Sequence, residues 1–234
     1  ALSPVLGVLI AGAAGKLRTE DGPPASWAEV TPNLGWLLLG SLFAAALVNA
    51  GPITVDILGA DSPPETVTRF GNAVIFARIP LFLFQAVQAA LLPRLARLAA
   101  QRQLPEFKRG LRHLLILVVG VGVVGTIGAF VLGPWLLDLV YDGGIDRRTM
   151  TLLAFASALY MLALALAQAV IALSGHAHVA AGWCAGFTTF ALVAWLSSND
   201  LYLRVELALV ASSVVSLVIF IATLSSRMNN GVIF

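Results

Sequence analysis

The chain of 234 residues is 59% hydrophobic and 11% charged, with a formal net charge of +2 and a mean hydropathy of +0.92. Soluble globular domains carry about 25% charged residues, so this composition excludes a soluble domain and indicates a multi-pass membrane protein. We expect no nucleic-acid partner for such a chain.

Six apolar runs are long enough to cross the hydrocarbon core of a bilayer, which requires about 20 helical residues. The predicted fold class is therefore all-α, a polytopic transmembrane helix bundle. In chain order, the predicted spans are residues 34–58, 68–92, 112–137, 150–173, 177–197 and 204–225.

A shorter apolar run precedes the first span. Residues 1–15 are followed by Lys16 and Arg18, which is the reverse of the order in a signal peptide. We therefore expect this run to be the end of a preceding transmembrane helix, with the N-terminal part of the protein missing from the chain. Residues 16–33 contain three prolines and mixed charge and are predicted to be a cytoplasmic linker between two lobes. Residues 226–234 are predicted to be a cytoplasmic tail.

Basic residues are distributed unevenly between the two ends of the predicted spans, and Lys and Arg near helix ends are retained in the cytoplasm. One side carries four, namely Arg69, Arg147, Arg148 and Arg204, while acidic residues such as Glu206 also gather there. The other side carries nine and is predicted to be cytoplasmic: Lys16, Arg18, Arg94, Arg97, Arg102, Lys108, Arg109, Arg112 and Arg227. Residues 94–113 on this side are predicted to form a short amphipathic segment on the inner leaflet, although retention of basic residues accounts for their charge equally well.

The glycines of the third predicted span indicate close helix packing, whereas the cysteine and the histidines indicate no metal site. Gly122, Gly125 and Gly128, with Ala129 on the same side, predict a surface that another helix approaches closely. The single cysteine, Cys184, and the three histidines have no metal-ligand spacing. We therefore predict no metal and no cofactor.

An arginine lies in the middle of the second predicted span. At a rise of about 1.5 Å per residue, Arg78 is about 15 Å below the outer end of the span, near the bilayer midplane. A charge at that depth costs at least about 2.5 kcal/mol on insertion scales and normally faces a water-filled cavity or a partner. Two interpretations remain open. Arg78 lines a central cavity and binds an anion such as a phosphate, or it hydrogen-bonds the Phe76 carbonyl, which Pro80 leaves without a helical donor.

Other polar residues of the spans are candidates for the same cavity. On a continuous helix, Gly71, Arg78 and Gln85 fall on one stripe, because seven residues make almost two turns. Asp56, near the outer end of the first span, is the candidate for ion coupling; it matches the depth of Arg69, with which we expect it to pair. The candidate substrate-binding residues are Arg78, Gln85, Arg69, Gln88 and Asn49.

Several short motifs resemble those of a known transporter superfamily. They are Asn72, Pro80 and the run "LLPRL" at 91–95, followed by "PWLLDLVYDGG" and "ALSGHAHVA". With these motifs the chain resembles the multidrug/oligosaccharidyl-lipid/polysaccharide exporter superfamily over roughly residues 1–225, and within it flippases of the Wzx and MurJ type.

The resemblance implies a two-lobe transporter of which residues 34–225 form the C-terminal six-helix lobe. Such a protein moves a polyprenyl-pyrophosphate-linked sugar or a peptidoglycan-type lipid precursor across the bacterial cytoplasmic membrane by alternating access. The implied partners are the lipid-linked anionic substrate, membrane lipids and the N-terminal lobe of the same protein. Cationic residues line the cavity of such proteins, and Arg78 and Arg69 match that property here.

Other functions remain open. A cation-coupled multidrug antiporter of the same superfamily needs an acidic residue deep in a lobe, for which Asp56 is the sole candidate identified. A membrane glycosyltransferase would use outward acidic residues such as Asp56 and Asp61, but the large loops typical of such enzymes are absent and we predict no catalytic residue. A non-transporting membrane scaffold is the last alternative.

Overall fold

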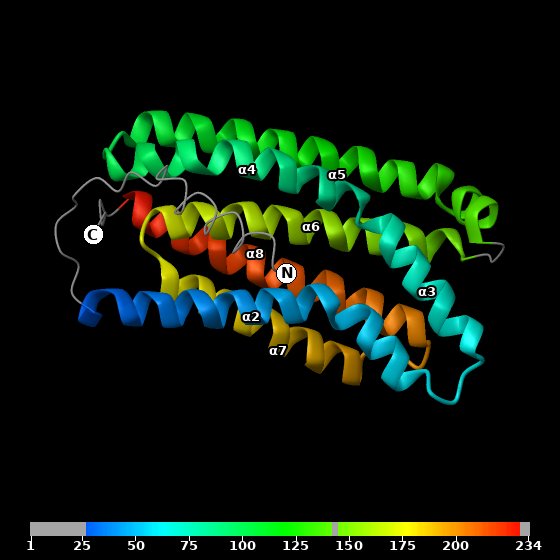
Figure 1. Cartoon of the computed structure of the whole chain (residues 1–234). Helices are drawn as coiled ribbons and strands as arrows, with labels where there is room; N and C mark the ends of the chain where they lie inside the picture. The colour runs from blue at the N-terminus through cyan, green and yellow to red at the C-terminus, as the bar shows by residue number, and fades with distance from the viewer. Residues whose placement is uncertain (1–26, 142–144, 230–234) are drawn as a thin grey trace, which may run out of the picture. The chain divides into compact units, whose positions relative to one another are not determined.

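The computed structural model describes residues 27–141 and 145–229, and this part of the chain is helical with no strand. The predicted all-α class is confirmed. The predicted segment 1–15, residues 16–26 of the predicted linker 16–33 and the last five residues of the predicted tail lie outside the described residues. Residues 27–33 of that linker belong to the first described helix, which begins at Trp27. The helices are α2 (Trp27–Leu58), α3 (Pro64–Ala77), α4 (Ile79–Ala100), α5 (Leu104–Tyr141), α6 (Arg147–Ala172), α7 (His176–Leu196) and α8 (Leu201–Asn229) (Figure 1).

Six segments of the described chain are long and apolar enough to cross a membrane, as predicted from the sequence. They are residues 31–58, 64–85, 104–141, 147–172, 176–196 and 201–229. Helix α6 is the most buried of them: it packs extensively against α5 and α8 and also meets α3, α4 and α7. Large apolar side chains such as Leu42, Val124 and Leu139 remain exposed on the outer helices. This distribution is typical of a bundle whose solvent is lipid.

The basic segment 94–113, predicted to be a short amphipathic segment on the inner leaflet, does not form an element of its own. Instead, α4 continues to Ala100 and α5 begins at Leu104, so the two helices form an extended antiparallel hairpin (Figure 1). Leu95 and Ala99 of α4 and Phe107 and Leu111 of α5 are all buried. Apolar contact between the helices thus stabilises this end of the hairpin, and α5, with 38 residues, is longer than a bilayer requires.

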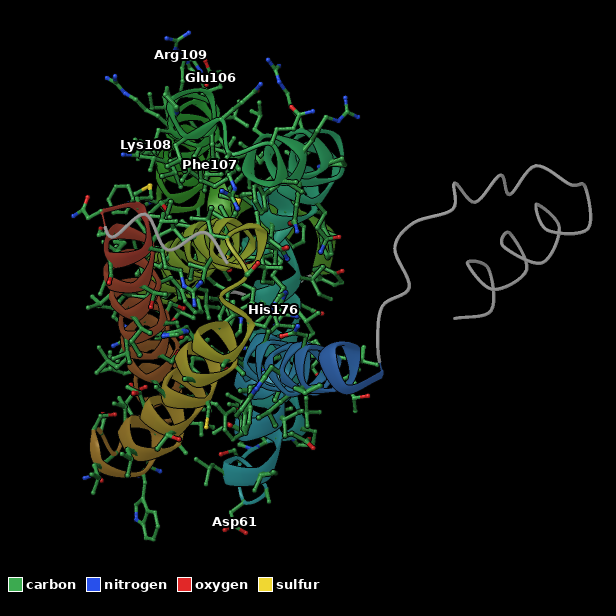
Figure 2. The ribbon with its side chains drawn as sticks, turned by 90° about the vertical axis from the view of Figure 1, so that its left-hand side faces the viewer. Asp61, Glu106, Phe107, Lys108, Arg109 and His176 are labelled. Atoms are coloured by element: carbon green, nitrogen blue, oxygen red, sulfur yellow. The ribbon has the colours of Figure 1, made fainter. Side chains whose placement is uncertain are left out.

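A three-residue turn closes the hairpin. Arg102 has a positive φ of 57°, and the N–H groups of Arg102 and Gln103 donate to the carbonyls of Ala99 and Leu98, both at 3.0 Å. These bonds satisfy carbonyls that the end of α4 would otherwise leave free. Figure 2 shows Lys108 and Arg109 pointing outward at the start of α5, where both are exposed. The basic charge therefore lies on the solvent side of the hairpin.

The second predicted span is not one continuous helix. It divides into α3 and α4 at Arg78, whose backbone has φ −94° and ψ −2°. Pro80 accounts for the break, because it has no N–H to donate and its ring crowds the carbonyl four residues earlier. The break invalidates the straight stripe predicted from Gly71 through Arg78 to Gln85.

Close helix packing is confirmed at two of the three glycines selected from the sequence. A Cβ on Gly122 would lie 2.9 Å from Ala158 Cβ of α6, and one on Gly125 would lie 2.6 Å from Pro80 Cγ. Gly128 faces open space. Helices α7 and α8 approach each other more closely still, and a Cβ on Gly182 would overlap the ring of Phe220, which is fully buried.

Replacing Gly182 with alanine should destabilise the bundle. The Phe220 ring packs edge-on against Trp183 at 5.1 Å between centroids and has no room to move away. We expect Gly182→Ala to lower the free energy of unfolding by about 1–3 kcal/mol, the usual cost of overpacking. Gly128→Ala is the matched control and should cost nothing, because its Cβ meets no atom. Equal unfolding curves for the two purified variants in detergent would contradict this packing.

Candidate functional site

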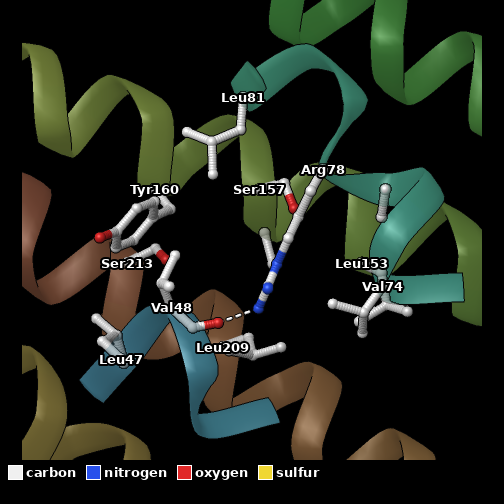
Figure 3. A pocket seen from close by; sticks show the side chains of 12 residues that line it. Leu47, Val48, Val74, Arg78, Leu81, Leu153, Ser157, Tyr160, Leu209 and Ser213 are labelled. Atoms are coloured by element: carbon white, nitrogen blue, oxygen red, sulfur yellow. Dashed lines mark hydrogen bonds between the residues drawn. The ribbon is translucent and has the colours of Figure 1, made fainter. Parts of the chain in front are cut away.

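The guanidinium of Arg78 is bound to the backbone of another helix. Its Nη2 donates to the carbonyl of Val48 in α2 (Figure 3). Val48 is four residues before Pro52, which has no N–H, so this carbonyl lacks its normal helical donor. As one of the two interpretations predicted, Arg78 donates to a backbone carbonyl that a proline leaves without a helical donor. The acceptor is the carbonyl of Val48 in α2, however, and not that of Phe76.

The rest of the Arg78 side chain borders a small cavity. The cavity has a volume of about 40 Å³, and its polar lining besides Arg78 comes from Ser157 and Tyr160 of α6 and Ser213 of α8 (Figure 3). Tyr160 Oη donates to the Ala44 carbonyl at 3.0 Å, one turn from Val48. A water molecule needs about 10–15 Å³, so the space admits a few waters and not a pyrophosphate. In this conformation the site is closed to a large substrate.

A double-mutant cycle tests the bond between Arg78 and the proline-freed carbonyl. Arg78→Ala should lower the free energy of unfolding by about 1 kcal/mol, because Val48 loses its donor inside the bundle. In a Pro52→Ala background the new N–H of residue 52 can bond Val48, so the same substitution should cost less. Unfolding in mixed micelles measures both losses. An identical loss in the two backgrounds would show that the Val48 carbonyl is not the group that Arg78 satisfies.

The remaining predicted cavity residues do not line the Arg78 cavity. Asn49 is exposed on α2 and donates from Nδ2 to the carbonyl of Ala45 at 2.8 Å. On α4, Gln85 is exposed and Gln88 is half-buried. Arg69 is exposed on α3. The helix break at Arg78 and the outward direction of these side chains keep them from forming one site with Arg78 within the described chain.

The expected ion pair between Asp56 and Arg69 is not formed. Arg69 Nη2 lies 3.3 Å from Glu65 Oε2, one helical turn away on α3. Asp56 is exposed at the end of α2. The local pair prevails because side chains four residues apart on a helix are neighbours. Removing Arg69 should therefore not compensate for the loss of the Asp56 charge.

A buried carboxylate was missed in the sequence. Glu206, near the start of α8, has no exposed surface, and neither of its oxygens has a hydrogen-bond partner among the described residues. Arg148 Nε of α6 lies 3.7 Å from Glu206 Oε2 and also approaches Asp146 at 3.6 Å, and its Nη2 lies 3.7 Å from Asp200. Glu206 lies inside the predicted span 204–225, and that position was the available sign that it is buried.

Comparison with known protein families, with curated proteins and with solved structures finds no match for this chain. The exporter resemblance thus remains an expectation from short sequence motifs. In the described part of the chain, no group of three or more His, Cys, Asp and Glu side chains is arranged to hold a metal ion.

Proposed function

We propose that the chain is one lobe of a membrane transporter that moves a polyprenyl-pyrophosphate-linked sugar, or a related lipid precursor, across the bacterial cytoplasmic membrane. The six apolar helices support a multi-pass membrane protein. The proposal for the transported compound rests on Arg78, a permanent cation within a membrane-spanning segment. Among the residues that the structure describes, its one hydrogen-bond partner is a neutral carbonyl of another helix.

Arg78 has the donors that such a task requires. A guanidinium carries several N–H groups in a planar fork that matches phosphate oxygens, and among the described residues Arg78 donates only to Val48. Charge-assisted bonds to a phosphate are stronger than a bond to a neutral carbonyl. A pyrophosphate can therefore replace Val48 as the partner once the cavity opens.

The helices around Arg78 lack backbone hydrogen bonds close to the cavity, because prolines interrupt them. Pro52 removes a hydrogen bond from α2, and Pro80 divides α3 from α4. Broken helices are tolerated in membranes where they line a cavity or meet other protein groups. Movement of α2 away from the α3–α4 junction would release the Val48 carbonyl, and movement away from α6 would release the Ala44 carbonyl that Tyr160 binds.

The full-length protein in liposomes provides the test. A fluorescent polyprenyl-pyrophosphate-linked sugar should cross the bilayer faster in proteoliposomes than in empty liposomes. An analogue with the same chain and an uncharged linkage should not be accelerated. Equal acceleration of both compounds would contradict recognition of the anion.

Cation-coupled antiport is the second candidate, and Glu206 favours it more than Asp56 does. Acidic residues buried in membrane helices commonly carry protons or bind ions in transporters. In an antiporter, Glu206→Gln should abolish coupled export while the folded protein persists. A scaffold without transport activity would show neither flipping nor export.

A further inference from the structure

An apolar groove lies between α2 and α7, on a different face from the Arg78 cavity. It has a volume of about 660 Å³ and runs from Ala46 to Leu58 along α2 and from Phe187 to Trp195 along α7. Ile53 and Ile57 line it and are 54% and 66% exposed. We call it the α2–α7 groove. Its walls are apolar along the whole length, apart from Thr54 on α2 and one cation at the end.

The cation at the end of the groove is Arg204 of α8. Its Nη2 donates to the carbonyl of Trp195 at 3.2 Å, while its Nε–H is buried without an acceptor among the described residues. Asp200, four residues earlier, approaches Arg148 at 3.7 Å and not Arg204. Arg204 therefore keeps both its charge and unused donors for an anion at the mouth of the groove.

The position and length of the groove match one leaflet of a bilayer. Ala46 lies twelve residues from Leu58, about 18 Å at about 1.5 Å per residue, and half of a hydrocarbon core is about 15 Å. Trp195 beside the mouth is 79% exposed, as is common for tryptophan at the level of lipid headgroups. An occupant with one apolar tail and an anion at its end fits this arrangement.

We propose that the α2–α7 groove binds an acyl chain of an anionic phospholipid of the outer leaflet, with the lipid phosphate on Arg204. The complementary charge favours a lipid over a transmembrane helix of another protein part, which brings an apolar surface and no anion. This lipid is a resident partner of the bundle and not the transported substrate. The proposal does not rest on the transport function.

Native mass spectrometry of the full chain in detergent measures how much lipid the protein retains. The protein is titrated with dioleoyl-phosphatidylglycerol or with dioleoyl-phosphatidylcholine. The wild type should retain phosphatidylglycerol at about tenfold lower lipid concentration than phosphatidylcholine, because both carry a phosphate but the choline cation of phosphatidylcholine opposes the Arg204 guanidinium, and about 1.4 kcal/mol corresponds to tenfold. Arg204→Gln should remove the preference, while Arg204→Lys, which keeps the charge, should retain part of it.

Two further variants separate the headgroup from the tail. Arg147→Gln removes an exposed cation that stacks on Phe130, at 5.3 Å from the ring centroid, and should leave the preference intact. Ala191→Leu fills the groove from an exposed position on α7 and should weaken retention of both lipids.

Several results would overturn the proposal. One is a preference for phosphatidylglycerol that survives Arg204→Gln or disappears equally in Arg147→Gln. Another is unchanged retention of both lipids by Ala191→Leu. Displacement of phosphatidylglycerol by a lower concentration of polyprenyl pyrophosphate would assign the groove to that compound. A photo-crosslink from position 191 to protein instead of lipid in native membranes would assign it to a helix.

Discussion

Arg148→Ala should be among the most destabilising single substitutions in the bundle. It removes the cation beside Glu206, whose side chain has no exposed surface, and leaves a buried carboxylate without a partner. Breaking a buried ion pair from one side costs about 3–5 kcal/mol. Because Arg148 is itself half-exposed, we expect a loss of about 3 kcal/mol in the free energy of unfolding, measured by denaturation in mixed micelles.

The matching variants isolate the cause of that loss. Glu206→Gln removes the buried charge itself and should cost less than Arg148→Ala. Adding Glu206→Gln to Arg148→Ala should recover most of the lost stability, since no unpaired charge then remains. Arg147→Ala, at an exposed neighbouring position, should change the stability little. Equal losses from Arg147→Ala and Arg148→Ala would contradict a buried pair.

Arg78→Ala should reduce flipping of a pyrophosphate-linked substrate by about tenfold or more, because it removes charge-assisted contacts worth about 1.5–3 kcal/mol. Arg78→Lys keeps a point charge at the same level and should retain intermediate activity. Arg69→Ala is the control: Arg69 is exposed, paired with Glu65 and does not line the Arg78 cavity. It should flip at nearly the wild-type rate. An equal loss of flipping activity in Arg69→Ala and Arg78→Ala would mean that flipping depends on the total positive charge of the lobe and not on Arg78 in particular.

The membrane-spanning helices were predictable because the backbone of a chain in a bilayer must make its hydrogen bonds within the protein. A polar backbone group without a partner is costly in hydrocarbon, so apolar runs of sufficient length form helices. That rule identified the six spans but not the ends of α4 and α5. The ends of α4 and α5 are stabilised by burial of side chains such as Leu95 and Phe107 between the two helices. The sequence of one helix alone does not reveal such contacts with the other.

The candidate site was predicted in part. The depth and cost of Arg78 follow from its place in an apolar run, and Pro80 was a visible reason for a helix break. The partner of Arg78 was not predicted, because Val48 is thirty residues away in sequence and on another helix. Pro52 was the available sign that the Val48 carbonyl needed a donor.

Two predictions about charged residues were wrong: the partner of Arg69, because a nearby residue was overlooked, and the location of Glu206, because its partner is distant in sequence. Arg69 pairs with Glu65, which lies four residues earlier on the same helix. Its predicted partner, Asp56, was chosen for its equal depth in the membrane. Glu206 was counted among outer acidic residues although it lies within a span. Its pairing with Arg148 requires α6 and α8 to meet, which the sequence does not state.

The central claim is that Arg78, which donates to the Val48 carbonyl in this conformation, binds the transported anion in place of that carbonyl when the cavity opens. It is tested most directly by measuring the melting temperature and the flipping rate on one preparation of full-length Arg78→Ala protein. We predict a melting temperature within about 4 °C of the wild type, as expected for about 1 kcal/mol in a chain of this size, and a flipping rate per folded molecule reduced at least about tenfold. A destabilised protein with normal flipping per folded molecule would contradict the claim and leave Arg78 a purely structural partner of α2.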